Sequence, residues 1–288
     1  MECTTGSGEA QEWGGLPGRW GGILAAVRAH LLQMDTTWEA KAENCRRLGE
    51  LLAGIDGLRG SGDLVVVPEM FDTGFSFDVE KTADGDGSTL GAICGLAREF
   101  GVTLHGSRTV VGSDGRGRNR VTVAGPDGRV LVEYDKIHPF SYGRESEFFS
   151  GGSEVVTYAW EAGGERLVAC PAICYDLRFP ELFRIGMLRG AEVFVLGANW
   201  PKPRKIHRRA LAVARAIENQ AYVLCVNRAG RDPYLEYAGE SVAVSPTGEV
   251  IGEAGEGEDV LSVELDVAAL RAWRATFPAW RDVKLINE

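Results

Sequence analysis

The chain has 288 residues, of which 44% are hydrophobic, and a formal net charge of −10. This length fits one large α/β domain or two ordinary ones, and the apolar fraction is enough for a full core. The acidic balance disfavours a general surface for nucleic acid or for anionic membranes, so we expect a small-molecule partner.

No stretch approaches the roughly 20 apolar residues of a membrane helix, and the first residues lack the cationic start and apolar segment of a secretion signal. We therefore predict a cytoplasmic protein that does not act at a membrane. The six cysteines are scattered and mostly lie in apolar runs, as reduced thiols do in cytosolic proteins. No structural disulfide is expected.

The start of the chain predicts a leader followed by alternating elements. Residues 1–22 are rich in Gly and polar residues, and we expect them to form a flexible leader. A single domain is expected over 23–288, beginning with an apolar run at 23–32. Apolar residues then recur on one face of a helical stretch at 38–58, and a further apolar run leads into Glu69.

A helix and three closely spaced strands are predicted next. The helix spans about 88–100, and the strands follow at 102–111, 120–124 and 129–134. The last two strands are separated by Pro126-Asp127-Gly128, which favours a tight reversal. Lys136 lies just past the last strand.

The second half of the chain alternates strands and helices. Residues 167–174 are apolar almost throughout, as in a strand covered on both faces, and Pro180 opens a helix that ends near Gly190. Cys174 is therefore expected at a strand-to-helix turn. The same pattern predicts a strand at 193–197, a helix at 206–219, a strand at 222–227 and a hairpin over 241–253. Such alternation predicts helices that cover the faces of the sheets.

Three short segments each end an apolar run with one reactive side chain. These residues are Glu69 in V-V-V-P-E-M-F, Lys136 in V-E-Y-D-K-I-H-P-F and Cys174 in A-I-C-Y-D-L-R-F-P-E. A carboxylate, an ammonium and a thiol at one sheet edge supply a base, an oxyanion partner and a nucleophile. The pattern indicates an amide hydrolase.

These segments, in this order, resemble the nitrilase (carbon-nitrogen hydrolase) superfamily, whose members carry a Glu-Lys-Cys triad. The similarity runs from about Ile23 to the C-terminus, and the chain looks most like the omega-amidase branch. It rests on the segments P-E-M-F-D-T-G-F, D-K-I-H-P-F, C-Y-D-L-R-F-P-E, G-A-N-W-P, R-A-I-E-N-Q and N-R-A-G.

The resemblance implies a fold and an assembly. The fold is an α/β four-layer αββα sandwich, in which two mixed sheets pack face to face with helices on the outer faces. Family members commonly form homodimers through helices near the nucleophile and through the C-terminal segment, here around 274–283. We therefore predict a homodimer of this kind.

The three residues predict a covalent mechanism that needs no metal and no organic cofactor. Glu69 takes the thiol proton as Cys174 attacks the amide carbon, and Lys136 stabilises the oxyanion together with the backbone N–H of Tyr175. A free thiol has a pKa of about 8.5, so we expect Lys136 and the helix that opens at Pro180 to favour the thiolate.

The resemblance also implies a second glutamate at the catalytic site, in a segment of the form E-x-x-aromatic-aromatic-x-P-G. The segment beginning at Glu145 matches, but Gly151 stands in place of the proline. Glu145 is therefore the candidate, with the role of orienting Lys136 and positioning substrate. Glu147 remains a rival because the proline that would fix the register is missing.

Further residues are candidates for substrate binding. Arg178 follows Cys174 by four residues, where related carbamoylases carry a carboxylate-binding arginine, and a planar guanidinium suits a substrate carboxylate. A structural ion pair in the R-F-P-E turn is the alternative for Arg178. Tyr175, Asn199 and Trp200 are expected to line the pocket.

Other patterns are weaker. His138 lies two residues past Lys136, but an imidazole that supports residues around the site, or one on the surface, is a better interpretation than a papain-like Cys-His pair. Cys170-x-x-x-Cys174 lacks the spacing of a zinc site. The basic run at 202–209 is interpreted as a solvated face or a subunit contact, and Gly255-Glu256-Gly257 has no following helix that would indicate nucleotide binding.

The leading hypothesis is an omega-amidase that removes the terminal amide of a short dicarboxylic monoamide, such as 2-oxoglutaramate or 2-oxosuccinamate, to give the acid and ammonia. The resemblance carries the choice of substrate. The alternatives are hydrolysis of an N-carbamoyl amino acid or amine by the same triad, hydrolysis of a nitrile, and a catalytically idle ligand-binding or scaffolding protein.

Overall fold

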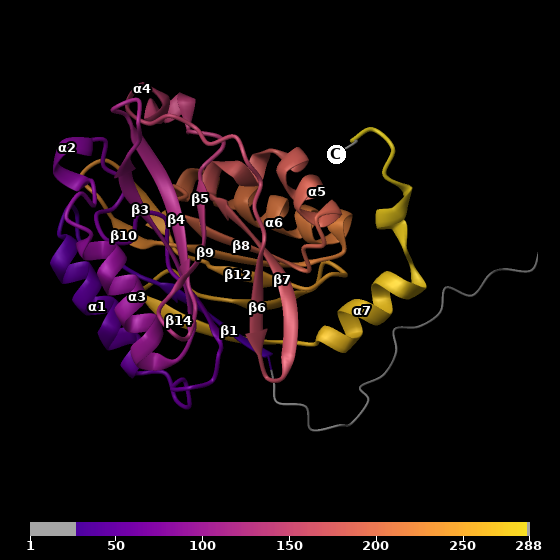
Figure 1. The fold of residues 1–288 in the computed structure, drawn as a ribbon. Helices are drawn as coiled ribbons and strands as arrows, with labels where there is room; N and C mark the ends of the chain where they lie inside the picture. The colour runs from indigo at the N-terminus through magenta and orange to yellow at the C-terminus, as the bar shows by residue number, and fades with distance from the viewer. Residues whose placement is uncertain (1–26, 287–288) are drawn as a thin grey trace, which may run out of the picture.

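Two six-stranded sheets form the centre of the structure (Figure 1). This computed structural model describes residues 27–286, so the predicted leader at 1–22 lies outside the described residues. In spatial order, the first sheet contains β14 (Asp259–Leu265), β1 (Val27–Gln33), β2 (Leu64–Val66), β3 (Thr103–Val111), β4 (Gly117–Ala124) and β5 (Val130–Asp135).

The second sheet is also mixed. In spatial order it contains β13 (Val250–Glu253), β12 (Val242–Val244), β9 (Tyr222–Asn227), β8 (Val193–Ala198), β7 (Glu165–Ile173) and β6 (Tyr158–Ala162). The strands β7, β8 and β9 run parallel, and the outer strands are antiparallel to their neighbours. A separate two-stranded hairpin is formed by β10 (Ala229–Arg231) and β11 (Glu236–Ala238).

Helices cover the outer faces of both sheets (Figure 1). The helices are α1 (Lys41–Ala53), α2 (Val79–Thr82), α3 (Ser88–Phe100), α4 (Glu145–Phe148), α5 (Pro180–Leu188), α6 (Lys205–Asn219) and α7 (Val267–Thr276). The pair α1 and α3 packs on the first sheet, and the pair α5 and α6 packs on the second. These four layers confirm the predicted αββα sandwich.

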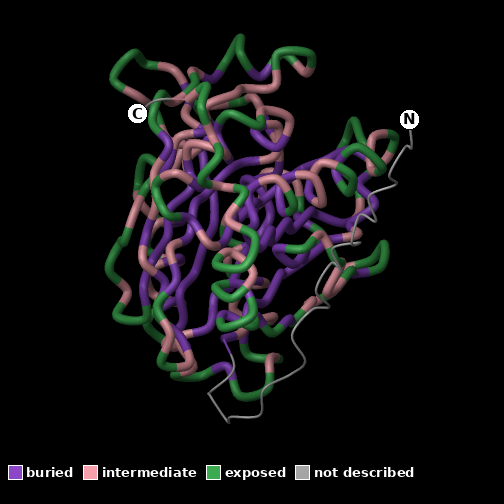
Figure 2. Tube along the Cα trace, turned by 90° about the vertical axis from the view of Figure 1, so that its right-hand side faces the viewer, coloured by how far each residue is buried: buried purple, intermediate pink, exposed green. Residues whose placement is uncertain are grey.

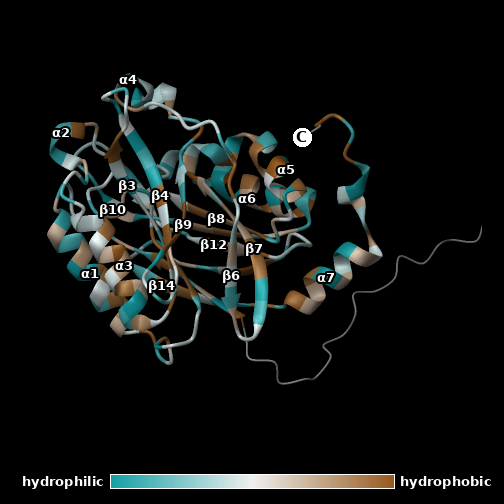
Figure 3. Ribbon diagram, viewed as in Figure 1, coloured by the Kyte–Doolittle hydropathy of each residue, from teal (hydrophilic) through white to brown (hydrophobic). Residues whose placement is uncertain are grey.

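The apolar residues lie in two clusters that follow from this layering. The larger one fills the space between the sheets and extends beneath α5 and α6, while the smaller one lies between the first sheet and α1 and α3. Buried residues accordingly run along the strands and exposed ones along the outer helices and loops (Figure 2). The central strands β8 and β9 are buried along their whole length and are largely hydrophobic, as strands covered on both faces are (Figure 3).

Most predicted elements are present, with shifted ends. The helix expected at 38–58 is shorter, because Gly54 ends α1 and turns follow. The predicted turn before β5 forms, with Gly128 at φ +78° and its N–H donating to the carbonyl oxygen of Gly125 at 2.8 Å. The strand expected to begin at Arg120 begins at Gly117, which brings Asn119 into the sheet.

Several parts of the fold were not predicted: the helices α2, α4 and α7, strand β6, the β10–β11 hairpin and strand β14. Strand β14 pairs with β1 across more than 200 residues of sequence, and no local pattern indicates that contact. No helix between residues 27 and 286 is long and apolar enough to cross a membrane.

Candidate active site

The predicted reactive side chains are brought together by strand direction. Strand β3 runs parallel to β2 and antiparallel to β4, and β4 is antiparallel to β5, so β2 and β5 end at the same edge of the first sheet. Glu69 follows β2 and Lys136 follows β5 at that edge. Cys174 follows β7 of the second sheet. The site therefore lies where both sheets meet.

Lys136 binds two carboxylates. Its Nζ lies 2.7 Å from Oε1 of Glu69 and 2.8 Å from Oε2 of Glu145, and all three side chains are at most 1% exposed. Burial alone would lower the pKa of the Lys136 ammonium, but the carboxylates of Glu145 and Glu69 outweigh it and raise that pKa above its ordinary value. Lys136 is thus a permanent cation.

Glu145 and not Glu147 is the glutamate at this cluster. Glu145 begins α4, and its Oε2 also accepts a hydrogen bond from the backbone N–H of Phe140 at 2.5 Å. Burial raises its pKa, partly offset by Lys136. Glu147 is exposed and pairs with Arg144 at 2.6 Å.

Asn119 was missed by the sequence analysis and joins the two carboxylates. Its Nδ2 donates to Oε1 of Glu69 at 2.7 Å and to Oε1 of Glu145 at 3.3 Å. Its backbone oxygen accepts from the N–H of Lys136 at 2.9 Å. The only sequence signal is one polar residue beside a predicted strand, and its direction becomes known from the register of β4.

The second sheet contacts the Glu69 carboxylate as well. The backbone N–H of Asn199 donates to Oε2 of Glu69 at 2.9 Å, and its side-chain amide donates to the Glu69 carbonyl oxygen at 2.8 Å. This approach depends on Gly197 in β8, since a Cβ there would lie 2.7 Å from the backbone oxygen of Val67 and 3.0 Å from the backbone nitrogen of Glu69. Glycine is thus required for close contact between the sheets.

Cys174 lies at a sharp change of direction. It begins a 3₁₀ turn, Cys174–Arg178, directly after β7, and its φ of +43° is in the left-handed region that side chains rarely adopt. Such a conformation costs about 1–3 kcal/mol and is common at active sites. Its thiol lines a cavity that Lys136 also lines.

The electrostatics of the thiol differ from the expectation. Burial and the negative charge of Glu69, with which the thiol forms a hydrogen bond, raise the pKa of Cys174 well above its usual range, although Lys136 opposes the shift. Lys136 thus favours the thiolate, as predicted, but it does not outweigh burial and Glu69, so the expectation of a thiol pKa lowered toward neutral pH is wrong. The helix at Pro180 begins six residues after Cys174, beyond the one-turn range of its dipole, and the nearer carboxylate dominates.

Asp176 holds the turn that carries Cys174. It accepts hydrogen bonds from the backbone N–H of Ile173 at 2.9 Å and from the hydroxyl of Tyr134 at 2.7 Å. It also binds Nδ1 of His138 at 2.8 Å, and the His138 ring stacks on Phe179 with centroids 3.7 Å apart. His138 thus supports the loop through its contacts with Asp176 and Phe179, and no hydrogen bond joins it to Cys174 within residues 27–286.

The cavity beside Cys174 is small and lined by aromatic and cationic side chains. Its volume is about 30 Å³, enough for one or two water molecules. The predicted pocket residues are all on its wall, together with others that the sequence did not indicate. The lining residues are Phe75, Lys136, Phe140, Cys174, Tyr175, Arg178, Asn199, Trp200, Pro201, Arg204 and Leu235.

Arg178 is the predicted carboxylate ligand in this cavity. Its guanidinium lies 4.7 Å from the centre of the Trp200 ring and 5.9 Å from that of Tyr175. It contacts Nδ1 of His207 at 3.4 Å, and it forms no ion pair with an acidic residue in the described part of the chain. The alternative of a structural ion pair in the R-F-P-E turn is therefore wrong.

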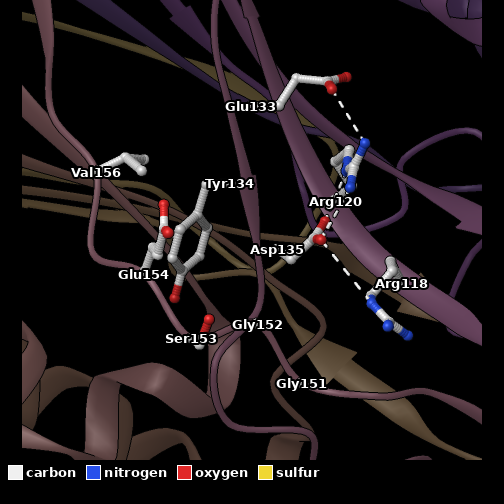
Figure 4. Close-up of a pocket in the computed structure, with 10 residues that line it drawn as sticks. All are labelled: Arg118, Arg120, Glu133, Tyr134, Asp135, Gly151, Gly152, Ser153, Glu154 and Val156. Carbon is white, nitrogen blue, oxygen red and sulfur yellow. Dashed lines mark hydrogen bonds and ion pairs between the residues drawn. The ribbon is translucent and has the colours of Figure 1, made fainter. Parts of the chain in front are cut away.

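A larger cavity of about 330 Å³ lies elsewhere, between β4, β5 and the segment 151–156 (Figure 4). Apart from Glu154, the charged side chains that line it are paired: Arg120 binds Asp135 at 2.6 Å and Glu133 at 3.0 Å, and Arg118 binds Asp114 at 3.0 Å. None of the four clustered residues, Glu69, Lys136, Glu145 and Cys174, lines it. The larger volume is thus not where the reactive groups meet.

The basic run at 202–209 is not simply a solvated face. Arg208 is buried and donates to the carbonyl oxygens of Gly239 and Glu240, and Arg204 lines the cavity beside Cys174. Only the outer members, such as Lys202 with Glu256 at 3.1 Å, form exposed pairs. Across residues 27–286, no three His, Cys, Asp or Glu side chains are grouped as a metal site would require.

Comparisons with known proteins agree with this geometry. The model of the carbon-nitrogen hydrolase family matches residues 28–275. The chain is 35% identical to the omega-amidase YafV of Escherichia coli strain K12 over 90% of this chain and 97% of that protein. It is 32% identical to the 2-oxoglutaramate amidase of Bacillus subtilis strain 168 over 88% of this chain and 96% of that protein.

A solved structure is similar over nearly the whole fold. XC1258 from Xanthomonas campestris, described as a CN-hydrolase superfamily protein with an arsenic adduct in the active site, superposes with a TM-score of 0.84 at 35% identity. The match covers 91% of this chain and 99% of that one.

The sandwich, the clustered side chains and these matches define a hydrolase that acts on carbon-nitrogen bonds. More particularly, the chain belongs to the carbon-nitrogen hydrolase family, in the omega-amidase-like branch of the nitrilase superfamily. The resemblance inferred from the sequence is thereby confirmed.

Proposed function

We propose that this protein is an omega-amidase that converts a short dicarboxylic monoamide, of the 2-oxoglutaramate or 2-oxosuccinamate type, into the dicarboxylate and ammonia through a thioester at Cys174. The observation that carries the proposal is the buried Glu69–Lys136–Glu145 cluster beside a thiol in a strained turn. The relatives named omega-amidase and 2-oxoglutaramate amidase support the choice of substrate class.

In the proposed first half-reaction, Glu69 takes the proton of the Cys174 thiol as sulfur attacks the amide carbon. The raised pKa of the thiol means that the proton has to leave during attack, and the hydrogen bond to Glu69 gives it a path. The tetrahedral oxyanion is stabilised by Lys136 and by the backbone N–H of Tyr175. Glu69 then protonates the amine, and ammonia departs.

In the second half-reaction, Glu69 removes a proton from water, which attacks the thioester carbon. The carboxylic acid is released and the thiol regains its proton. Lys136 keeps its charge throughout, because two carboxylates hold its pKa high. Glu145 orients Lys136, and Asn119 and Asn199 fix Glu69 by three hydrogen bonds of 2.7–2.9 Å.

The distal end of the cavity supports a substrate with a carboxylate. Arg178, packed on Trp200 and Tyr175, has no acidic partner within the described chain and lines the same cavity as Cys174. Because an arginine binds a carboxylate by two parallel hydrogen bonds, a terminal carboxylate of the substrate is its expected partner.

The test is release of ammonia from 2-oxoglutaramate, measured beside N-carbamoyl-β-alanine and an aliphatic nitrile, with Cys174→Ala as the blank. Turnover of the monoamide that is lost in the variant supports the proposal. Carbon dioxide with ammonia from the carbamoyl compound alone would replace the substrate class. A protein inactive on all three, with Cys174 no more reactive toward iodoacetamide than the other thiols, would favour an idle binding protein.

We further propose a cytoplasmic homodimer formed through the helices after Cys174 and the segment 274–283. Phe277 in that segment is 47% exposed, and Ile217 of α6 is 52% exposed, so both are available to a second copy. Sedimentation at micromolar concentration should give twice the mass of the chain, and a monomeric mass would contradict this assembly.

A further inference from the structure

A second guanidinium faces the catalytic cavity beside that of Arg178. Arg204 ends the 3₁₀ turn Lys202–Arg204, lines the cavity that contains Cys174, and lies 5.5 Å from the centre of the Phe140 ring. Its guanidinium forms neither a hydrogen bond nor an ion pair with any residue in 27–286. In a chain with net charge −10, an arginine half-buried without an acidic neighbour is notable.

The backbone that carries Arg204 is fixed on both sides. Its carbonyl oxygen accepts a hydrogen bond from Nε1 of Trp200 at 2.8 Å, and Pro201 forms a bridge with Tyr237 of β11. The backbone N–H of Trp200 in turn donates to Asn227 at 2.7 Å. The backbone origin of the Arg204 side chain is therefore held in place beside the cavity.

The aromatic rings between the two arginines form one continuous wall. Arg178 lies on Trp200 and Tyr175, Arg204 lies on Phe140, and the rings of Phe140 and Tyr175 are 4.9 Å apart. A guanidinium that stacks on a ring keeps its N–H edge free for an anion. Apart from the Nη2 of Arg178, which contacts His207 at 3.4 Å, both edges are thus available to a ligand in the same cavity.

We propose that Arg204 is a second carboxylate-binding residue, which together with Arg178 selects amides whose far end is an anion over neutral amides of the same length. This inference rests on the proposed function, and it assigns recognition of the terminal carboxylate of the substrate to two arginines. The methylene chain of the substrate would lie against Phe140 and Leu235, and the substrate amide would lie at Cys174 and Lys136. The small volume of the cavity means that the arginine and Leu235 side chains turn aside as substrate enters.

The test compares two amides of equal length. Glutaric acid monoamide carries a terminal carboxylate and pentanamide does not. We expect Arg204→Gln to lower kcat/KM for the acid amide by about 10- to 100-fold, mostly through KM, because the contact is made equally in the ground and transition states. The change in kcat/KM for pentanamide should be much smaller, so the ratio of the two kcat/KM values should fall, and Arg204→Lys should recover part of that loss.

The matched control is Lys202→Gln, which removes a cation from the same turn but outside the cavity; it should leave the ratio of the two kcat/KM values unchanged. An Arg204→Gln variant with the wild-type ratio would overturn the proposal. Circular dichroism shows whether each variant is folded. If Arg204→Gln is not folded, Arg204→Lys replaces it in the comparison of the two amides.

A binding experiment separates this inference from the proposed function. Calorimetry of glutarate with Cys174→Ala needs no turnover, and adding Arg204→Gln should weaken binding by about tenfold or more. If the wild type hydrolyses neither amide but Arg204→Gln weakens the binding of glutarate, the proposed substrate is refuted and the anion site is supported. If glutarate binds both proteins equally, or neither, the anion site is refuted.

Discussion

Two cavities in the described part of the chain are lined by consecutive residues at the end of β5. Tyr134 and Asp135 line the larger cavity, and Lys136 lines the smaller one beside Cys174. In the larger cavity, Arg118 and Arg120 are paired with acidic side chains (Figure 4). In the smaller one, two arginines lack acidic partners within the described chain, and a thiol lies in a strained turn.

The difference shows that volume alone is a poor guide to function. The larger cavity has about ten times the space, but both of its arginines are already paired with acidic side chains. The smaller one is lined by a nucleophile, a permanent cation and two guanidiniums without acidic partners in the described chain, and the base Glu69 contacts the cation; these are the groups that a reaction needs. Unsatisfied chemistry, rather than concavity, distinguishes the site.

The largest expected effect separates the two cavities directly. Cys174→Ala should lower kcat/KM on the amide substrate by about 10⁴-fold or more, since the variant has no nucleophile. Arg118→Gln, in the wall of the larger cavity, should leave kcat/KM unchanged. Steady-state ammonia release measures both, and comparable losses in the two variants would break the comparison.

A smaller loss is expected from Asn119→Ala. This change removes a donor to both Glu69 and Glu145, and a hydrogen bond to a charged group contributes about 1.5–3 kcal/mol. We expect kcat to fall by about 10- to 100-fold with little change in KM, since Asn119 acts through Glu69. Asn119→Asp, of equal size but with a third negative charge, should lose more. A wild-type kcat in Asn119→Ala would contradict this positioning role.

Gly197→Ala tests the contact between the sheets. The added methyl group meets backbone atoms of Val67 and Glu69, so the variant should lose about 1–3 kcal/mol of unfolding free energy and should also lose activity as Glu69 shifts. Gly95→Ala, in α3 with nothing within 4 Å of the new Cβ, should gain up to about 1 kcal/mol. Urea unfolding of both measures the contrast, and equal stability would contradict it.

The pH dependence of the thiol gives the smallest and most specific effect. Because burial and Glu69 raise the pKa of Cys174, the 240 nm thiolate absorbance that it contributes, taken against Cys174→Ala, should stay flat up to about pH 9. Glu69→Gln removes the negative charge but leaves Lys136, so the pKa should fall. A thiolate signal near neutral pH in the wild type would refute the account of the electrostatics.

The residues of the site that a local sequence pattern marks were predicted from the sequence. Glu69, Lys136 and Cys174 each end an apolar strand, and strand direction brings such ends to a common edge. Asn119 was missed because its role depends on which face of β4 it occupies. Arg204 was interpreted as part of a basic run on the surface, because the cavity that it lines forms only when segments distant in sequence come together.

In the fold as well, elements with a local sequence pattern were predicted and elements that depend on remote contacts were not. The helix at 88–100 and the parallel strands β7 to β9 are marked by periodicity and by continuous apolar runs. Strand β14 and the β10–β11 hairpin depend on contacts remote in sequence, which no local pattern carries. The direction of the Cys174 pKa shift also requires the structure, because it depends on the distance to Glu69 relative to Lys136 and on burial.

The measurement that tests the central claim most directly is the mass of the protein quenched in acid during turnover of the monoamide substrate. The account predicts an acyl adduct equal to the substrate minus ammonia, located by peptide mapping on Cys174 and absent in Cys174→Ala. Ammonia release without any adduct after rapid quenching, or an adduct on another cysteine, would contradict a thioester at Cys174.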